Sequence, residues 1–147
     1  MIDSLKSKKI ILDTNVLVSV LLSHKQDRAK LRHLLEYILE YSQLYASYET
    51  FQELENVINR DKFQKYLPKV LITTFLDEIK KEIKFIEPNI SIDACRDSND
   101  NKFLELAKAA NIDVIITGDK DLLDLNPYED TMIITPNEAF TIIENNL

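Results

Sequence analysis

The sequence predicts an α/β fold built on a central, mainly parallel five-stranded sheet. Short runs rich in isoleucine, leucine and valine alternate with longer stretches in which apolar residues recur at helical spacing. With 147 residues, 45% of them hydrophobic, the chain is long enough to form one domain with its own core. No repeat, low-complexity tract or Gly/Ser-rich linker marks a second domain, so we treat residues 1–147 as a single domain.

Each element follows from local pattern. Strands are expected where short apolar runs are bounded by polar residues, at residues 9–12, 44–46, 84–86, 114–116 and 132–134. Helices are expected over 31–39, 54–58, 70–83 and 103–107, where apolar residues recur every three or four positions. In the stretch after Pro68, the inward-facing residues are expected to be Val70, Leu71, Thr74, Phe75, Ile79 and Ile83. The charged run 77–82 is expected to be a solvated helix face.

Composition limits the cellular setting and the partners. A single cysteine, Cys95, excludes an intramolecular disulfide and favours a reducing interior. The apolar run 10–22 is interrupted by polar residues and shorter than the roughly 20 residues that span a bilayer, so we expect a cytoplasmic protein without a membrane partner. A net charge of −7 argues against a broad basic surface for nucleic acid, unless bound cations neutralise an acidic patch where a phosphate must approach.

Two classes of site can be set aside. The two histidines, His24 and His33, lie nine residues apart, which does not fit a histidine-rich zinc site. Gly118 is the sole glycine, which excludes a Walker A loop and a glycine-rich dinucleotide fingerprint.

Two acidic residues follow predicted strands directly. Asp13 comes after the first strand, with Thr14 and Asn15 opening the next helix; alone, it would slightly favour an ordinary helix N-cap. Asp119 follows the fourth strand in the segment Thr117-Gly118-Asp119-Lys120-Asp121, where a capped helix start is again the simpler alternative. The sole glycine in that turn suggests a special backbone conformation or the close approach of a ligand. Ligands of open parallel sheets collect at these strand ends.

Two further acidic segments are weaker on their own. Asp97 and Asp100 lie in a polar loop before the helix of Phe103, and such residues are common in any loop of this kind. Glu53 stands one position before the apolar stripe that starts at Leu54, with Glu49 one turn earlier on the same side. A solvated helix face is the simpler explanation for both glutamates.

Together, these acids would repel each other in a partly buried cleft unless a cation joined them. With oxygen ligands alone, Mg²⁺ or Mn²⁺ is the expected ion. Such an ion retains waters and substrate phosphates in its shell, which suits hydrolysis of a phosphodiester.

Four motifs of the chain, in their order, resemble those of PIN-domain proteins. They are Ile-Leu-Asp-Thr-Asn, Gln-Glu-Leu-Glu, Arg-Asp-Ser-Asn-Asp-Asn-Lys-Phe-Leu-Glu-Leu-Ala and Ile-Thr-Gly-Asp-Lys-Asp-Leu-Leu. The chain looks most like the branch that provides toxins of prokaryotic toxin–antitoxin pairs, and the match runs from about residue 9 to about residue 140.

The resemblance implies a three-layer α/β/α domain with strand order 3-2-1-4-5 and a Mg²⁺- or Mn²⁺-dependent endoribonuclease. It also implies a cognate antitoxin and a possible homodimer. The family's acids fall on Asp13, Glu53, Asp100 and Asp119, which would be both catalytic and metal-binding. Asp97 remains the alternative for the third position. The supporting residues would be Thr14, Asn15, Asp97, Thr117 and Asp121.

Three other functions compete with the nuclease. A phosphate-receiving regulatory module needs an acidic pair after the first strand and a lysine after the fifth, where this chain has only Asp13 and Thr135-Pro136. A phosphatase with an aspartate nucleophile would need a second acid at position 15, which is Asn15. A PIN-like module that only binds a protein partner is the main alternative.

RNA binding leaves its own question open. Arg96, Lys102 and Lys120 are candidates for contacts with RNA phosphates, although simple solubility explains them equally well.

Overall fold

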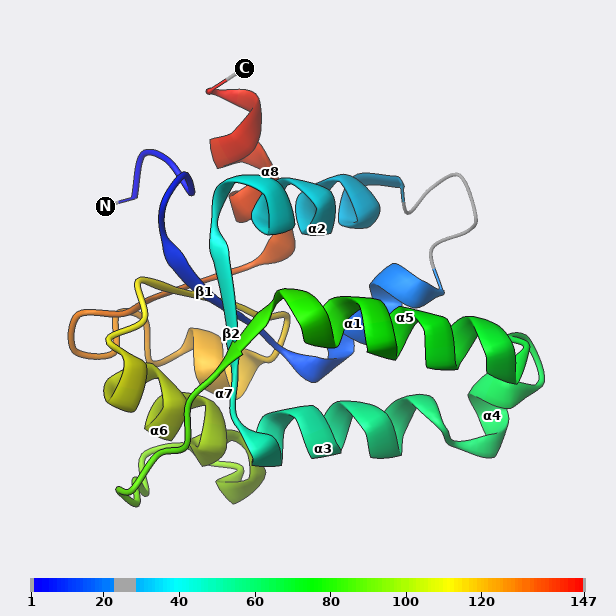
Figure 1. The fold of residues 1–147 in the computed structure, drawn as a ribbon. Helices are drawn as coiled ribbons and strands as arrows, with labels where there is room; N and C mark the ends of the chain where they lie inside the picture. The colour runs from blue at the N-terminus through cyan, green and yellow to red at the C-terminus, as the bar shows by residue number, and fades with distance from the viewer. Residues whose placement is uncertain (1, 23–28, 147) are drawn as a thin grey trace.

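A computed structural model describes residues 2–22 and 29–146, and these residues form helices on both faces of a five-stranded sheet (Figure 1). His24 lies outside them. The strands are β1 (Lys9–Leu12), β2 (Gln43–Ala46), β3 (Ile83–Phe85), β4 (Val114–Ile116) and β5 (Met132–Ile134). The helices are α1 (Thr14–Leu21), α2 (Ala29–Tyr41), α3 (Tyr48–Ile58), α4 (Asp61–Gln64), α5 (Lys69–Glu82), the 3-10 helix η2 (Ser98–Asp100), α6 (Asn101–Ala110), α7 (Lys120–Leu123) and α8 (Pro136–Glu144).

The sheet order is β3-β2-β1-β4-β5, as the resemblance implied. All four strand pairings are parallel, so the sheet is wholly and not only mainly parallel. The chain builds β1, β2 and β3 outward in one direction and then returns to place β4 on the other side of β1. The strand order therefore reverses between β1 and β4, and the carboxyl ends of these two strands border the crevice where open α/β sheets bind ligands.

The core consists of two apolar layers separated by the sheet. Along β1, Ile10 and Leu12 face the layer formed with α1, α2, α3, α5 and α8, whereas Ile11 faces the layer formed with α6 and α7. In β4, Ile115 faces the α6 side and its two neighbours face the other. This alternation is the period of two that a strand buried on both faces requires, and Figure 1 shows the two helical layers.

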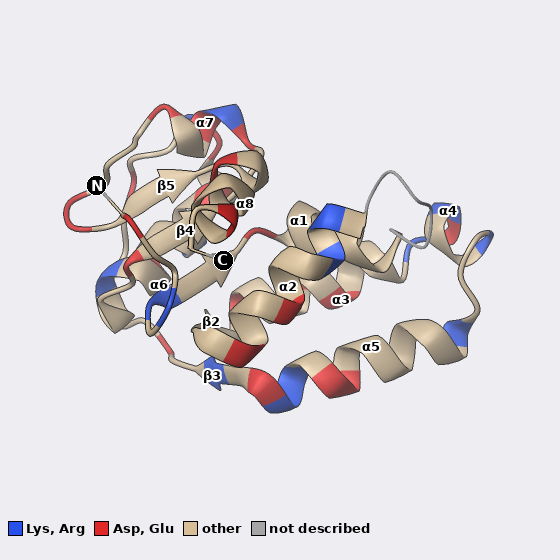
Figure 2. Ribbon diagram, turned by 90° about the horizontal axis from the view of Figure 1, so that it is seen from above, with Lys and Arg blue, Asp and Glu red and all other residues tan. Residues whose placement is uncertain are grey.

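The predicted helices are present, but the inward face of α5 is only partly the predicted one: Ile79 is buried as expected, whereas Val70, Leu71 and Thr74 are exposed. Its buried residues are Ile72, Leu76 and Ile79, while Val70 is 74% exposed and Leu71 is 52% exposed. The helix carries more apolar residues than one face can bury, so its sequence is compatible with two overlapping apolar faces, and only one of them packs against the core. The run 77–82 is exposed apart from Ile79, as expected, and Figure 2 shows its acidic and basic residues side by side on α5.

Helix α8 was not predicted. Thr135 caps it, because the Thr135 hydroxyl accepts the Glu138 N–H while the Glu138 carboxylate accepts the Thr135 N–H. Pro136 occupies the first turn, where its missing N–H costs no hydrogen bond. A Thr-Pro-x-Glu sequence of this kind is a readable start signal. Among the helices that the structure describes, none is long and apolar enough to cross a membrane.

We expect Ile72→Ala to lower the free energy of unfolding by about 2–5 kcal/mol, because Ile72 is 1% exposed and its truncation leaves a cavity. Val70→Ala, two positions earlier on the same helix, should change it by less than about 0.5 kcal/mol. Urea denaturation of both variants measures the difference. Equal destabilisation by the two substitutions would contradict the orientation of α5.

Candidate functional site: an acidic cluster at the ends of β1 and β4

Asp13 and Asp119 come together because their strands are neighbours. Asp13 follows β1 directly, and its N–H donates to the Ile116 carbonyl at 3.0 Å, which continues the β1–β4 ladder into the site. Asp119 stands three residues beyond the end of β4 and begins α7. The predicted convergence of these strand ends is therefore present in the fold.

The Thr117 hydroxyl joins the two segments. It donates to Asp13 Oδ2 at 2.7 Å and accepts the Asp119 N–H at 2.9 Å. Asp13 is 5% exposed and stands at the N-cap position of α1, yet its side chain makes no capping hydrogen bond. The alternative that Asp13 is an ordinary helix cap therefore fails, because its carboxylate points across to β4.

Three carboxylates form the centre of the site. Asp100, Asp119 and Asp121 each place one oxygen within 4.8 Å of the other two. Asp119 caps α7 by accepting the Asp121 N–H at 2.9 Å, which fixes the two acids of that turn relative to each other. Asp100 reaches them from the end of η2, the 3-10 helix that leads into α6.

Asp100 carries the strongest sign of a missing ligand. Its Oδ2 atom is buried and has no hydrogen-bond partner among the described residues. Burial, then the hydrogen bond to Asp119 and the negative charges of Asp119 and Asp13, raise the pKa of Asp100 from 3.8 to about 8. A buried polar oxygen without a partner is costly. An all-carboxylate donor set of this kind fits a hard divalent cation.

Asp13 shares this strained electrostatic environment. Burial raises its pKa above 3.8, and the charges of Glu53 and Asp119 act in the same direction, while hydrogen bonds from the Thr117 hydroxyl and the Thr14 backbone oppose them. Asp13 therefore lies close enough to feel the negative charges of both Glu53 on α3 and Asp119 on α7. A cation bound among these carboxylates would relieve their mutual repulsion.

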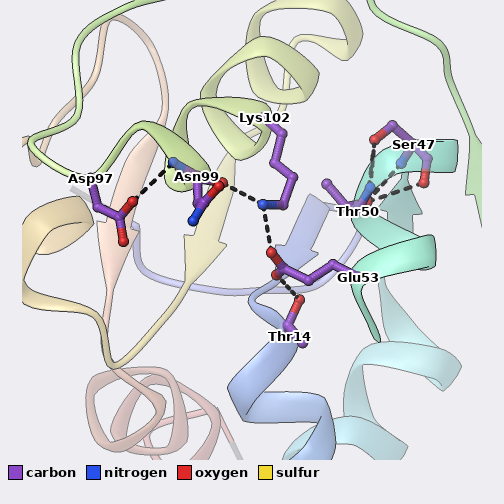
Figure 3. A network of polar contacts seen from close by, with 7 residues as sticks. All are labelled: Thr14, Ser47, Thr50, Glu53, Asp97, Asn99 and Lys102. Carbon is purple, nitrogen blue, oxygen red and sulfur yellow. Dashed lines mark hydrogen bonds and ion pairs between the residues drawn. The ribbon is translucent and has the colours of Figure 1, made fainter. Parts of the chain in front are cut away.

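Glu53 lies on α3 and faces the site with both oxygens occupied. Its Oε1 accepts the Thr14 hydroxyl at 2.5 Å, and its Oε2 pairs with Lys102 Nζ at 2.5 Å (Figure 3). Lys102 is 8% exposed and also donates to the Asn99 carbonyl. A carboxylate and an ammonium group therefore meet in a largely buried pair beside Asp13.

The remaining predicted residues are less closely involved. Asp97 is exposed, and its carboxylate accepts the Asn99 N–H at 3.0 Å, so it caps η2. Its charge still contributes to the raised pKa of Asp100. Asn15 is exposed on the first turn of α1.

Gly118 does not have a positive φ, which makes the expectation of a special backbone conformation wrong. Nothing lies within 4 Å of where its Cβ would be, so the close approach of a ligand stays a prediction.

The three cations considered for RNA differ in exposure. Arg96 is exposed and lies 3.8 Å from Asp121, and Lys120 is also exposed, whereas Lys102 is buried in its pair with Glu53. Cys95 is buried nearby, and burial together with Asp100 and the other acids raises the pKa of its thiol to about 11. The thiol is therefore not a ready nucleophile.

Two features of the site were underestimated from the sequence. Asp121 belongs to the central group of three carboxylates, although the sequence placed it only among the supporting residues. Lys102 was considered only as a surface contact for RNA. Its position one turn before Leu106, on a face of α6 that is otherwise apolar, was the available signal for its burial.

Comparison with known proteins agrees with this fold. The sequence matches the PIN domain family over residues 9–121, and the chain therefore belongs to the PIN-domain family. It is 34% identical to protein MJ1680 of Methanocaldococcus jannaschii over 119 residues, which cover 80% of this chain and 74% of that protein.

Solved structures show the same fold at low sequence identity. PAE2754 from Pyrobaculum aerophilum aligns with a TM-score of 0.63 and 14% identity over 94% of this chain and 90% of its own. VapBC2 from Rickettsia felis, solved bound to a DNA fragment from its promoter, aligns with a TM-score of 0.58 and 15% identity over 86% and 98%. FitAcB from Neisseria gonorrhoeae aligns with a TM-score of 0.55 and 21% identity over 86% and 97%.

The raised pKa of Asp100 predicts how metal-free stability depends on pH. An unfolded Asp100 ionises near pH 3.8, whereas the folded one keeps its proton to about pH 8. Its contribution to stability is therefore full below about pH 4 and is lost as the pH rises to about 8. In urea denaturation with a chelator, wild type should lose more stability between about pH 5 and about pH 8.5 than Asp100→Asn. Asp93→Asn, at an exposed acid earlier in the same segment, should follow wild type, and an identical slope for Asp100→Asn and wild type would contradict the assignment.

Proposed function

We propose that this chain is a metal-dependent endoribonuclease that acts as the toxin of a toxin–antitoxin pair. The observation that carries the proposal is the buried, unpartnered oxygen of Asp100 within a group of carboxylates at the switch point of the sheet. Membership of the PIN-domain family supports nuclease chemistry. A protein that only bound a partner would gain nothing from carboxylates held against one another.

The proposed ion is Mg²⁺ or Mn²⁺, held by Asp100, Asp119 and Asp121 with Asp13 beside them. When bound, such an ion supplies a water that is activated near neutral pH and stabilises charge on the phosphate oxygens. Asp100 would give up its proton and offer its free oxygen. Thr117 would hold Asp13 in place, and the Asp121 N–H would fix Asp119. Glu53 was also predicted as a ligand from the sequence, but both of its oxygens already have partners, Thr14 and Lys102.

The substrate would approach from the solvent side of this cluster. Arg96 and Lys120 are exposed near the carboxylates and are the proposed contacts for RNA phosphates flanking the scissile one. Since the net charge is −7, the strand would be held mainly through the ion and these few cations. Thr14 and Asn15 open α1 at the same end of the sheet, and Asn15 is exposed to an incoming strand.

The toxin role rests on the fold neighbours. VapBC2 was solved bound to a DNA fragment from its promoter, and FitAB was solved bound to an IR36 DNA fragment. By analogy with these complexes, we propose that this chain is held by a cognate antitoxin and that it forms a homodimer in the cytoplasm.

Cleavage of RNA tests the proposed activity. The purified chain with Mn²⁺ should cut single-stranded or hairpin RNAs internally, and Asp13→Asn and Asp119→Asn should lower the rate by at least about 100-fold, as does loss of a group that stabilises transition-state charge. Asp97→Asn is the matched control because that acid is exposed, caps η2 and lies outside the central group of three carboxylates. Equal cleavage by wild type, Asp13→Asn and Asp119→Asn would identify a contaminating nuclease and overturn the assignment.

Thermal melting separates the nuclease from a pure binding module. A ligand that binds only the folded state raises the unfolding midpoint, so millimolar Mn²⁺ should raise it for wild type and much less for Asp119→Asn. Because the ion must displace the proton of Asp100, the rise should be larger near pH 8 than near pH 6. A midpoint unchanged by Mn²⁺ at both pH values would favour the binding module.

A further inference from the structure

The pair formed by Lys102 and Glu53 divides the acidic site into two parts. On one side, Asp100, Asp119 and Asp121 form a group of carboxylates without a buried basic side chain among the described residues that contact them. On the other side, Glu53 has a partner on each oxygen, the Thr14 hydroxyl and the Lys102 ammonium group. Asp13 lies between the two parts, since the charges of both Glu53 and Asp119 act on it.

Lys102 is held in this position from two directions. Its ammonium group pairs with Glu53 Oε2 and donates to the carbonyl of Asn99, the residue immediately before Asp100 (Figure 3). Its exposed fraction is 8%, which is low for a lysine and requires a fixed partner for the charge. The ammonium group therefore belongs to the site as a permanent cation, tethered to α6, and is independent of the metal concentration.

We propose that Lys102 takes the place of a second divalent cation, so that the site binds a single Mg²⁺ or Mn²⁺ on its Asp100–Asp119–Asp121 side. This proposal rests on the proposed metal-dependent function. A second ion beside Glu53 would have to displace the Thr14 hydroxyl or the lysine from the carboxylate. It would also lie next to a positive charge that the fold keeps in place.

Lys102 is on this account a positioning residue. It holds Glu53 against Thr14 at the start of α1, next to Asp13, and it keeps the Glu53 side of the site neutral while the ion occupies the other side. The backbone contact to Asn99 also connects the lysine to the loop that carries Asp100. Lys102 thus keeps its own ammonium group on the Glu53 side of the site and leaves the other side to the metal ion.

Counting bound ions tests this inference without RNA. Titration with Mn²⁺, followed by the electron paramagnetic resonance signal of the free ion, should give a single bound ion for wild type. Lys102→Met removes the tethered charge and should allow a second, weaker Mn²⁺ to bind. Lys102→Met combined with Glu53→Gln should return the count to a single ion, and Lys102→Arg, which retains the charge, should keep it there.

Several outcomes would overturn the inference. These are a pair of ions bound to wild type, a count that Lys102→Met leaves unchanged, or no binding at all. Should Lys102→Met fail to fold by circular dichroism, Lys102→Gln replaces it, because it also removes the charge but keeps a donor for Glu53 and Asn99, and it should likewise allow a second Mn²⁺ to bind. Absence of any bound Mn²⁺ would overturn the proposed metal-dependent function as well, whereas a pair of ions in wild type, or a count that Lys102→Met leaves unchanged, overturns only the role of Lys102.

Discussion

The mutual repulsion of carboxylates at one edge of the sheet is the constraint on which the site depends. Five acids, Asp13, Glu53, Asp100, Asp119 and Asp121, converge there within the described chain, and burial makes their negative charges more costly. The protein relieves this repulsion by different means on its two sides. Lys102 neutralises Glu53 through a tethered charge, and the raised pKa of Asp100 favours its protonated form on the other side in the absence of an ion. The proton of Asp100 can be exchanged for a metal ion, whereas the charge of Lys102 cannot.

The topology explains why these acids meet although they are far apart in the sequence. The hydrogen bond from Thr117 to Asp13 spans 104 residues, and it exists because β4 returns to the side of β1 opposite β2. The neighbouring helices α1, α3 and α6 then contribute one acid each from a cap or from the first two turns, and α7 contributes two, Asp119 and Asp121. The apolar alternation in β1 and β4 fixes the register, so a shift by one residue would turn Asp13 and Asp119 away from each other.

Sequence reasoning reached the fold and the convergence of acids at the strand ends, but not the pairing within that group. The strand ends at Asp13 and Asp119 were predictable because a strand followed by an acid is a local pattern. The choice of stripe on α5 was not, since Val70 and Leu71 are as apolar as Ile72 and only tertiary packing selects among them. The pair of Lys102 and Glu53 joins α6 to α3, and no periodicity within either helix records a contact between them.

Cys95 provides a chemical probe of the loop that carries Asp97 and Asp100. Its sulfur is the single thiol of the chain, it is buried, and its N–H donates at 2.8 Å to the side-chain carbonyl of Asn101, the residue after Asp100. A motion that lifts this loop away from α6 would therefore expose the sulfur to solvent at the same time. The rate at which an alkylating reagent reacts with the native protein thus reports how often this loop leaves α6.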